Sequence, residues 1–213
     1  MRVDLVLASN ALGVLAGGNG AGKTTLLRVL GTALSPNAGT ARVFGLDVRS
    51  QAARVRRLID LVPSTGGCYP ELTAVENLRF VARMRGLAVS GEEIRMVLRH
   101  VGLDHVADDQ PRTFSTGMLR RLTLARLLLV RPALALLDEP YAGLDEEGRA
   151  LVDALVVGML ADGRSVLVAT HEQGRLEHMA DVVVHLERGA VSAVKAGTPV
   201  SRSLETARVG GFV

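Results

Sequence analysis

Short runs of mostly apolar residues recur along this chain. The runs are LGVLAG (residues 12–17), RLIDLV (57–62), ALALLD (133–138), SVLVAT (165–170) and DVVVHL (181–186). A short apolar run bounded by turn signals is typical of a strand that is buried on both faces. Because such strands belong to sheets covered by helices on both sides, we expect an α/β fold with a parallel sheet.

Helical spacing of the apolar residues separates several of these runs. It covers about residues 23–34, 146–160 and 173–179. The segment ARVFGLDV, residues 41–48, has the pattern of an exposed strand pair or turn. Alternation of strands and helices is the signature of parallel βαβ units, which supports the same fold class.

The middle third of the chain has helical patterns with no strand between them. Thr73 with Glu76, and Ser90 with Glu93, have the spacing of capping boxes, which open helices. A third helix is predicted to begin near Ser115 and to end near residue 130. Three consecutive helices predict an α-helical subdomain.

Length and composition fit a single domain with a subdomain inserted in it. The chain has 213 residues, 48% of them hydrophobic and 3% aromatic, so a sizeable core must consist mostly of Leu, Val and Ala. We expect one domain over residues 1–195, with the helical subdomain at about 65–131, and a loose tail over 196–213. The single cysteine, Cys68, cannot form an internal disulfide, which fits a reducing compartment.

Net charge and hydropathy limit the kinds of partner that we expect for this chain. The net charge is +3 and the arginines are scattered, which together with few aromatic residues disfavours nucleic acid. The start of the chain has no signal-peptide pattern. The longest apolar stretch, residues 122–137, is interrupted by Arg126, Arg131 and Pro132 and cannot cross a bilayer. At a membrane, another chain is therefore expected to do the spanning.

A glycine-rich segment, GGNGAGKTT at residues 17–25, follows the first apolar run and precedes a helical pattern. It satisfies G-x-x-x-x-G-K-[ST], in which glycines let backbone N–H groups surround an anion and the next helix adds its dipole. The strand before it and the helix after it favour a phosphate loop over an ordinary turn. The expected nucleotide-binding residues are Gly17, Asn19, Gly20, Ala21, Gly22, Lys23, Thr24 and Thr25.

Three further polar groups follow predicted strands. Asp138 ends one strand, where it can hold Mg²⁺ together with the Thr24 hydroxyl. Glu139 comes next and can orient or deprotonate a water molecule. His171 follows another strand and can donate a hydrogen bond to a γ-phosphate. Each has an ordinary structural explanation alone, but beside a phosphate loop they predict nucleotide hydrolysis, with Glu139 and His171 as the catalytic residues.

The segment FSTGM, residues 114–118, places a serine and a glycine at the start of the third helix of the middle region. A helix N-terminus of this kind is a second anion site, and a plain N-cap is the simpler alternative. Because it belongs to the helical subdomain, it need not face the nucleotide of its own chain.

Together these segments resemble the ATP-binding cassette (ABC) ATPases over nearly the whole chain. GGNGAGKTT resembles the Walker A motif, ALALLDE Walker B, FSTGM the signature motif (usually LSGGQ), AGLD the D-loop, and THE the H-switch. The resemblance implies a P-loop NTPase core of the RecA type that uses ATP and Mg²⁺. It also implies a head-to-tail homodimer, in which Ser115, Thr116 and Gly117 contact the nucleotide of the partner chain.

Three departures from the family pattern change the expectations. Nothing aromatic precedes Phe44, so the adenine-stacking platform and the first, N-terminal edge strands are expected to be missing. Ser64, or Thr65 with a one-residue shift, stands where the Q-loop glutamine usually contacts the metal, and we assign Ser64 to the metal site with Thr24 and Asp138. The signature has Thr116 and Met118 in place of the usual glycine and glutamine, which export cassettes often tolerate.

YPELTAVENLRF, FSTGM and DEPYAGLD resemble single-cassette exporters, most of all the ATPase of the haem exporter used in cytochrome c maturation (CcmA type). This implies a separate integral membrane permease, a peripheral position on the cytoplasmic face of the inner membrane, and no nucleic acid. The alternatives are the ATPase of an ABC-2-type drug or polysaccharide exporter, and a soluble ABC ATPase acting on nucleic acid or a cofactor-assembly scaffold. A degenerate cassette that binds nucleotide poorly is a third.

Overall fold

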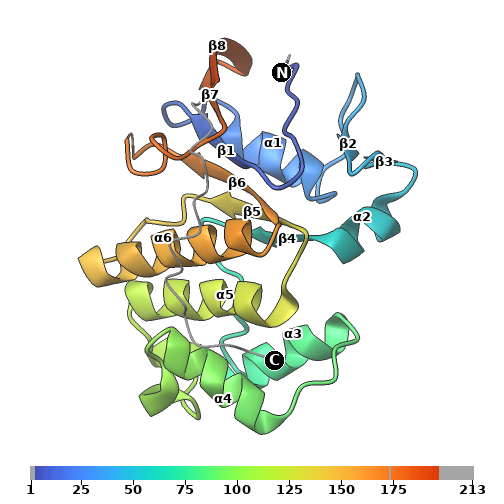
Figure 1. The fold of residues 1–213 in the computed structure, drawn as a ribbon. Coiled ribbons are helices and arrows are strands. Elements are labelled where there is room, and N and C mark those ends of the chain that lie inside the picture. Colours follow the sequence, from blue (N-terminus) through green and yellow to red (C-terminus); the bar gives the residue numbers. More distant parts are fainter. Residues whose placement is uncertain (1–2, 173, 197–213) are drawn as a thin grey trace.

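A six-stranded sheet forms the centre of the molecule in a computed structural model that describes residues 3–172 and 174–196 (Figure 1). The strand order is β4-β5-β6-β1-β7-β8, and every pair is parallel except the antiparallel pair β7–β8. The strands are β1 (Leu12–Ala16), β4 (Ile59–Val62), β5 (Leu134–Asp138), β6 (Ser165–Thr170), β7 (Val182–Glu187) and β8 (Ala190–Ala196). The predicted α/β fold and all five predicted core strands are confirmed.

Six α-helices and a small hairpin complete the described part of the chain. The helices are α1 (Lys23–Leu30), α2 (Ala52–Leu58), α3 (Ala74–Met84), α4 (Gly91–His100), α5 (Thr116–Val130) and α6 (Glu146–Ala161). The hairpin pairs β2 (Arg42–Val43) with β3 (Leu46–Asp47), and two 3₁₀ turns, η1 (Asp104–Val106) and η2 (Pro111–Thr113), precede α5. None of the helices in the described ranges is long and apolar enough to cross a membrane.

Local sequence signals set the helix starts as expected. Both predicted capping boxes form: Thr73 and Ser90 each accept a hydrogen bond from the backbone N–H three residues on, and the side chains of Glu76 and Glu93 accept one in return. The Ser115 side chain accepts a hydrogen bond from the Met118 backbone N–H and so caps α5.

Three expectations for the secondary structure are wrong. The helix predicted over 173–179 is absent from its described residues, which form turns, since Gly174 has φ 91° and a helix cannot continue through a left-handed residue. Leu58, expected in a strand, ends the unpredicted helix α2. Ala196, expected in the tail, pairs with Val182 in β8; the rest of the expected tail, residues 197–213, lies outside the described residues.

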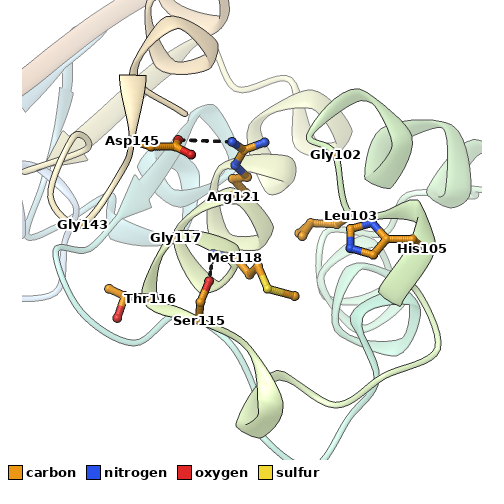
Figure 2. Close-up of a pocket in the computed structure, with 10 residues that line it drawn as sticks. All are labelled: Gly102, Leu103, His105, Ser115, Thr116, Gly117, Met118, Arg121, Gly143 and Asp145. Carbon is orange, nitrogen blue, oxygen red and sulfur yellow. Dashed lines mark hydrogen bonds and ion pairs between the residues drawn. The ribbon is translucent and has the colours of Figure 1, made fainter. Parts of the chain in front are cut away.

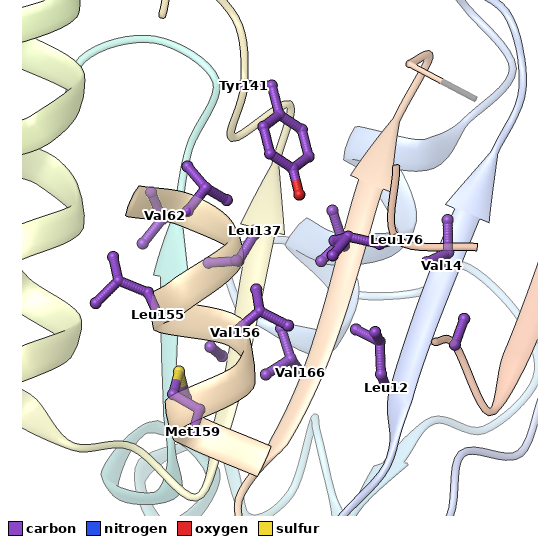
Figure 3. Close-up of a cluster of buried hydrophobic side chains, with 14 of the residues drawn as sticks. Leu12, Val14, Val62, Leu137, Tyr141, Leu155, Val156, Met159, Val166 and Leu176 are labelled. Atoms are coloured by element: carbon purple, nitrogen blue, oxygen red, sulfur yellow. The ribbon is translucent and has the colours of Figure 1, made fainter. Parts of the chain in front are cut away.

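Helices cover both faces of the sheet. On one face, strand residues such as Leu12, Leu137 and Val166 pack against Val156 of α6 (Figure 3). On the other, Leu15 and its neighbours pack against α1 and α2. Because both faces are buried, each strand is apolar at nearly every position, which is the pattern that the sequence shows.

Helix α5 belongs to two cores at once. Leu124 and Leu127 pack in the core between the sheet and α6. Leu122, Ala125 and Leu129 pack in a separate core with α3 and α4. This explains why its sequence has almost no polar face. The helices α3 and α4 therefore form a separate layer together with α5 (Figure 1). Helix α5 also belongs to the layer of helices that covers the sheet.

A buried acid joins this helical layer to the edge of the sheet. Asp60 of β4 is 1% exposed, and its Oδ1 accepts hydrogen bonds from Arg85 at 2.6 Å and from Arg126 of α5 at 2.8 Å. Arg85, the C-cap of α3, also donates to the Arg56 carbonyl at the end of α2. One carboxylate thus holds α3, α5 and β4 together.

We expect Asp60→Asn to lower the free energy of unfolding by about 3–5 kcal/mol, because it leaves two arginines without the negative charge that balances them. Asparagine keeps the size of the side chain, so no cavity contributes. Urea denaturation followed by circular dichroism measures the change.

The matched control is Asp108→Asn, which breaks the solvent-exposed pair between Asp108 and Arg95. It should change the stability little, since exposed ion pairs are screened by water. A destabilisation of the same size in both variants would contradict this role for Asp60.

Candidate nucleotide-binding site

The glycine-rich loop after β1, the Asp138–Glu139 turn at the end of β5 and His171 after β6 meet at one edge of the sheet. Strand β1 lies beside β6, with Ala16 paired to Thr170, and β5 lies on the other side of β6, with Asp138 paired to Ala169. The carboxyl ends of the three strands are therefore level, and the loops that follow them lie side by side. In parallel sheets this edge is where ligands bind.

The phosphate loop spans the turn between β1 and α1. Gly17 has φ 147°, and a Cβ there would lie 2.3 Å from the Leu186 carbonyl oxygen, so only glycine fits. Gly22, with φ 104°, precedes α1, whose first turn receives no side-chain cap. The backbone N–H groups of that turn have no partner inside the helix and form an anion site.

All eight predicted nucleotide-binding residues fall in this turn or in the first turn of α1. Ala21 is buried, its N–H bonds to the Gly18 carbonyl at 3.2 Å and its carbonyl accepts from the Gly189 N–H at 3.0 Å. Asn19 and Gly20 are exposed at the mouth of the loop, and Thr25 is exposed on α1. A hydrogen bond from the β7–β8 turn thus anchors the loop at Ala21, and the loop is exposed to solvent at Asn19 and Gly20.

Lys23 lies under the loop rather than out in solvent. The side chain is 6% exposed, and its Nζ donates to the carbonyl oxygens of Gly17 at 2.6 Å and Gly18 at 3.3 Å. It also lies 3.3 Å from Oε1 of Glu139. A buried ammonium needs such partners, and here they direct it toward the space that the loop surrounds.

Thr24 and Asp138, the predicted metal ligands, are in direct contact. The Thr24 hydroxyl lies 3.0 Å from both carboxylate oxygens of Asp138, which is 2% exposed. Among the described residues, no group of three or more His, Cys, Asp or Glu side chains is arranged to hold a metal ion. A hydroxyl and one carboxylate suit Mg²⁺, which is held by few protein ligands together with phosphate oxygens and water.

Glu139 and His171 are in direct contact. Oε2 of Glu139 lies 2.8 Å from Nδ1 of His171 and accepts a hydrogen bond from the His171 backbone N–H at 3.2 Å. Glu139 has φ 47°, a left-handed conformation that is strained for a glutamate, and its N–H is bonded to the Ala169 carbonyl at 2.8 Å. The backbone thus turns the carboxylate toward both Lys23 and His171.

Ser64, assigned to the metal site from the sequence, is held through its backbone. Arg120 of α5 donates hydrogen bonds to the carbonyls of Pro63 and Ser64. The role of the Ser64 hydroxyl at the metal site stays a prediction. Burial lowers the pKa of the Arg120 guanidinium, and the charges of Asp138 and Glu139 oppose that shift. Arg120 was missed in the sequence, because α5 contains three arginines, Arg120, Arg121 and Arg126, and no local pattern shows which of them is buried.

The residues Ser115, Thr116 and Gly117 lie apart from this cluster. They line a cavity of about 550 Å³ at the start of α5, with Arg121 and Asp145 on its wall (Figure 2). Arg121 and Asp145 form an ion pair at 3.3 Å, which ties α5 to the turn before α6. None of the phosphate-loop residues lines this cavity.

Comparison with known proteins agrees with the geometry. A family model described as "ABC transporter" matches residues 1–142. The chain is 36% identical to the daunorubicin/doxorubicin resistance ATP-binding protein DrrA of Streptomyces peucetius, over 90% of this chain and 58% of that protein. It is 39% identical to the cytochrome c biogenesis ATP-binding export protein CcmA of Cupriavidus necator, over 79% of this chain and 74% of that protein.

The fold has a solved counterpart. The dimeric ATP-binding cassette MJ0796, in a post-hydrolysis state bound to ADP and Pi, superimposes with a TM-score of 0.84 at 26% identity, over 92% of this chain and 89% of that one. The phosphate loop, the Thr24–Asp138 pair and the Glu139–His171 contact thus lie within a matching fold, and the chain belongs to the ABC transporter family as an ATP-binding domain.

Proposed function

We propose that this chain hydrolyses ATP and that the free energy drives a membrane exporter. The observation that carries the proposal is the cluster of Lys23, Glu139 and His171, in which one carboxylate lies 3.3 Å from the Lys23 ammonium and 2.8 Å from the His171 imidazole. A hydrolase needs a base beside the phosphate-binding groups, and Glu139 has that position.

Each group of residues in the site has its own part in the proposed reaction. The N–H groups of the phosphate loop and Lys23 hold the β- and γ-phosphates. Thr24 and Asp138 hold Mg²⁺, which neutralises charge on the phosphate oxygens. Glu139 orients a water molecule and accepts its proton, the backbone N–H of His171 holds Glu139, and the His171 imidazole donates a hydrogen bond to the γ-phosphate.

Replacing Glu139 tests the base directly. Glu139→Gln should bind ATP normally but turn it over about 10²–10⁴ times more slowly, because the amide keeps the shape and loses the basic oxygen. Steady-state release of phosphate and calorimetric titration with ATP measure the two effects separately.

Lys23→Ala is the contrasting variant. It removes the charge that holds the phosphates and should weaken ATP binding at least about tenfold, or about 1.4 kcal/mol. Turnover of the Glu139→Gln variant at the wild-type rate would remove Glu139 from this role.

We further propose a head-to-tail homodimer. The cavity at Ser115, Thr116 and Gly117 combines a helix N-terminus with an open front, and no phosphate-loop residue of the same chain lines it. A second copy facing it in the opposite direction brings its own Lys23 and Thr24 to this cavity, and twofold symmetry then makes two equal sites. The solved relative MJ0796 is itself dimeric.

A mixture of two inactive variants tests the composite site. Ser115→Arg and Lys23→Ala are each expected to be inactive alone, because each spoils both sites of its homodimer. In an equal mixture about half of the dimers are mixed and carry one intact site, so roughly a quarter of the wild-type rate should return.

The control is a mixture of Lys23→Ala with Glu139→Gln, whose changes fall on the same side of the composite site. This mixture contains no intact site and should stay inactive. Equal recovery in both mixtures, or recovery in neither while the wild type is active, would refute the trans role of Ser115.

Export is the transport function that the relatives favour. DrrA is a drug resistance protein and CcmA an export protein by name, and the chain spans 58% of the first and 74% of the second. We propose a separate membrane permease as partner and a peripheral position on the cytoplasmic face of the membrane. Haem and a drug or polysaccharide remain the competing substrates, because the permease selects the substrate.

Co-purification distinguishes an exporter subunit from an ABC ATPase that acts on nucleic acid or on an assembly scaffold. Affinity capture of the tagged chain from detergent-solubilised membranes should recover a polytopic membrane protein, identified by mass spectrometry. Recovery from the soluble fraction together with nucleic acid, and without any membrane protein, would contradict the exporter proposal.

A further inference from the structure

The carboxylate of Asp153 in α6 uses both of its oxygens. The Tyr141 hydroxyl donates a hydrogen bond to Oδ1 at 2.6 Å, and Nε of Arg175 donates to Oδ2 at 2.9 Å. Tyr141 is 1% exposed within the core beneath the sheet (Figure 3), and its phenol oxygen has no role in apolar packing. A buried hydroxyl that is bonded to a carboxylate fixes the ring in one position.

One partner of Asp153 is close in sequence to Glu139, and the other is close in sequence to His171. Tyr141 follows Glu139 by two residues, and Arg175 follows His171 by four. Glu139 and His171 themselves come from different strands, β5 and β6, and meet at 2.8 Å. One carboxylate on a third element therefore holds both loops whose side chains must stay in contact.

Further contacts make the arrangement rigid. Nη2 of Arg175 donates to Oε1 of Glu146 at 2.7 Å, so its guanidinium is bound to two acids of α6. The same guanidinium lies 5.6 Å from the centre of the Tyr141 ring. Burial raises the pKa of Tyr141, and the bond to Asp153 acts in the same direction, so the phenol stays a donor at neutral pH.

A second link reinforces the loop after His171. Arg149 of α6 pairs with Glu172 at 3.3 Å. The residue next to His171 is thus also fastened to α6. Ordinary core packing accounts for the ring of Tyr141, but it does not account for a carboxylate divided between these two loops.

We propose that Asp153 is a positioning residue, which keeps Glu139 and His171 at hydrogen-bonding distance by binding Tyr141 and Arg175 at the same time. The proposal rests on the function proposed above for Glu139 and His171. It predicts that damage to this network slows the chemical step and leaves nucleotide binding intact, since neither Asp153 nor its partners lie in the phosphate loop.

The test compares kcat and ATP affinity in two backgrounds. Tyr141→Phe and Asp153→Asn, made in the wild type, should each lower kcat by about tenfold, whereas the Kd for ATP should change by less than about twofold. In a His171→Ala background the same two changes should have no further effect on kcat. If the network acts through the contact, removing the contact removes its influence.

Asp108→Asn is the matched control, because it is the same chemical change at the exposed pair with Arg95 on α4. It should leave kcat unchanged. An equal loss of kcat from Tyr141→Phe in both backgrounds, no loss in either, or weakened ATP binding at unchanged kcat would each overturn the proposal.

A measurement that needs no turnover separates this proposal from the proposed function. The imidazole ¹⁵N resonances of His171, identified by their loss in His171→Ala, should move in Tyr141→Phe and Asp153→Asn and stay in place in Asp108→Asn. Unmoved resonances overturn the positioning role. A wild-type protein that does not hydrolyse ATP overturns the proposed function, while the spectra still test the contact.

Discussion

The parallel register of β5, β6 and β1 is the constraint on which the site depends. Asp138 is paired with Ala169, and Ala16 with Thr170, so the three strands end level at one edge of the sheet. A slip by one residue would move every side chain to the opposite face, where the close-packed side chains of the other core leave no matching space for it. The glycine-rich loop and the Glu139–His171 pair therefore owe their mutual positions to the packing of the core.

Two carboxylates, Asp60 and Asp153, link elements that pack around this sheet. Asp60 accepts hydrogen bonds from two arginines of the helical layer, and Asp153 accepts hydrogen bonds from a tyrosine and an arginine that follow Glu139 and His171 in the sequence. Within the site, Lys23 is already paired with Glu139, so phosphate and Glu139 compete for the same ammonium. In the proposed function, binding of phosphate thus alters the surroundings of the catalytic base.

The elements that the sequence predicts well are those with a local cause. The phosphate loop needs its glycines within the turn itself, as the positive φ angles of Gly20 (76°) and Gly22 (104°) show. The capping boxes at Thr73 and Ser90 and the cap at Ser115 satisfy backbone groups within the same turn. Buried strands show as apolar runs because both of their faces are covered. These features depend on neighbours in the sequence, so the sequence alone determined them.

Only the tertiary structure decided which distant groups meet. The strand order, the double use of α5 and the hydrogen bonds of Arg120 to the Ser64 loop depend on packing between segments far apart in the chain. The turn at Gly174 replaced a helix that apolar spacing predicts, and Arg175 beyond it is bound to α6 instead. The sequence by itself determined the glycine-rich loop, the capped helix starts and the buried strands, because each of these has a local cause. The contacts of Asp60 and Asp153 required the fold, because a carboxylate finds its partner through space and leaves no periodic pattern in the chain.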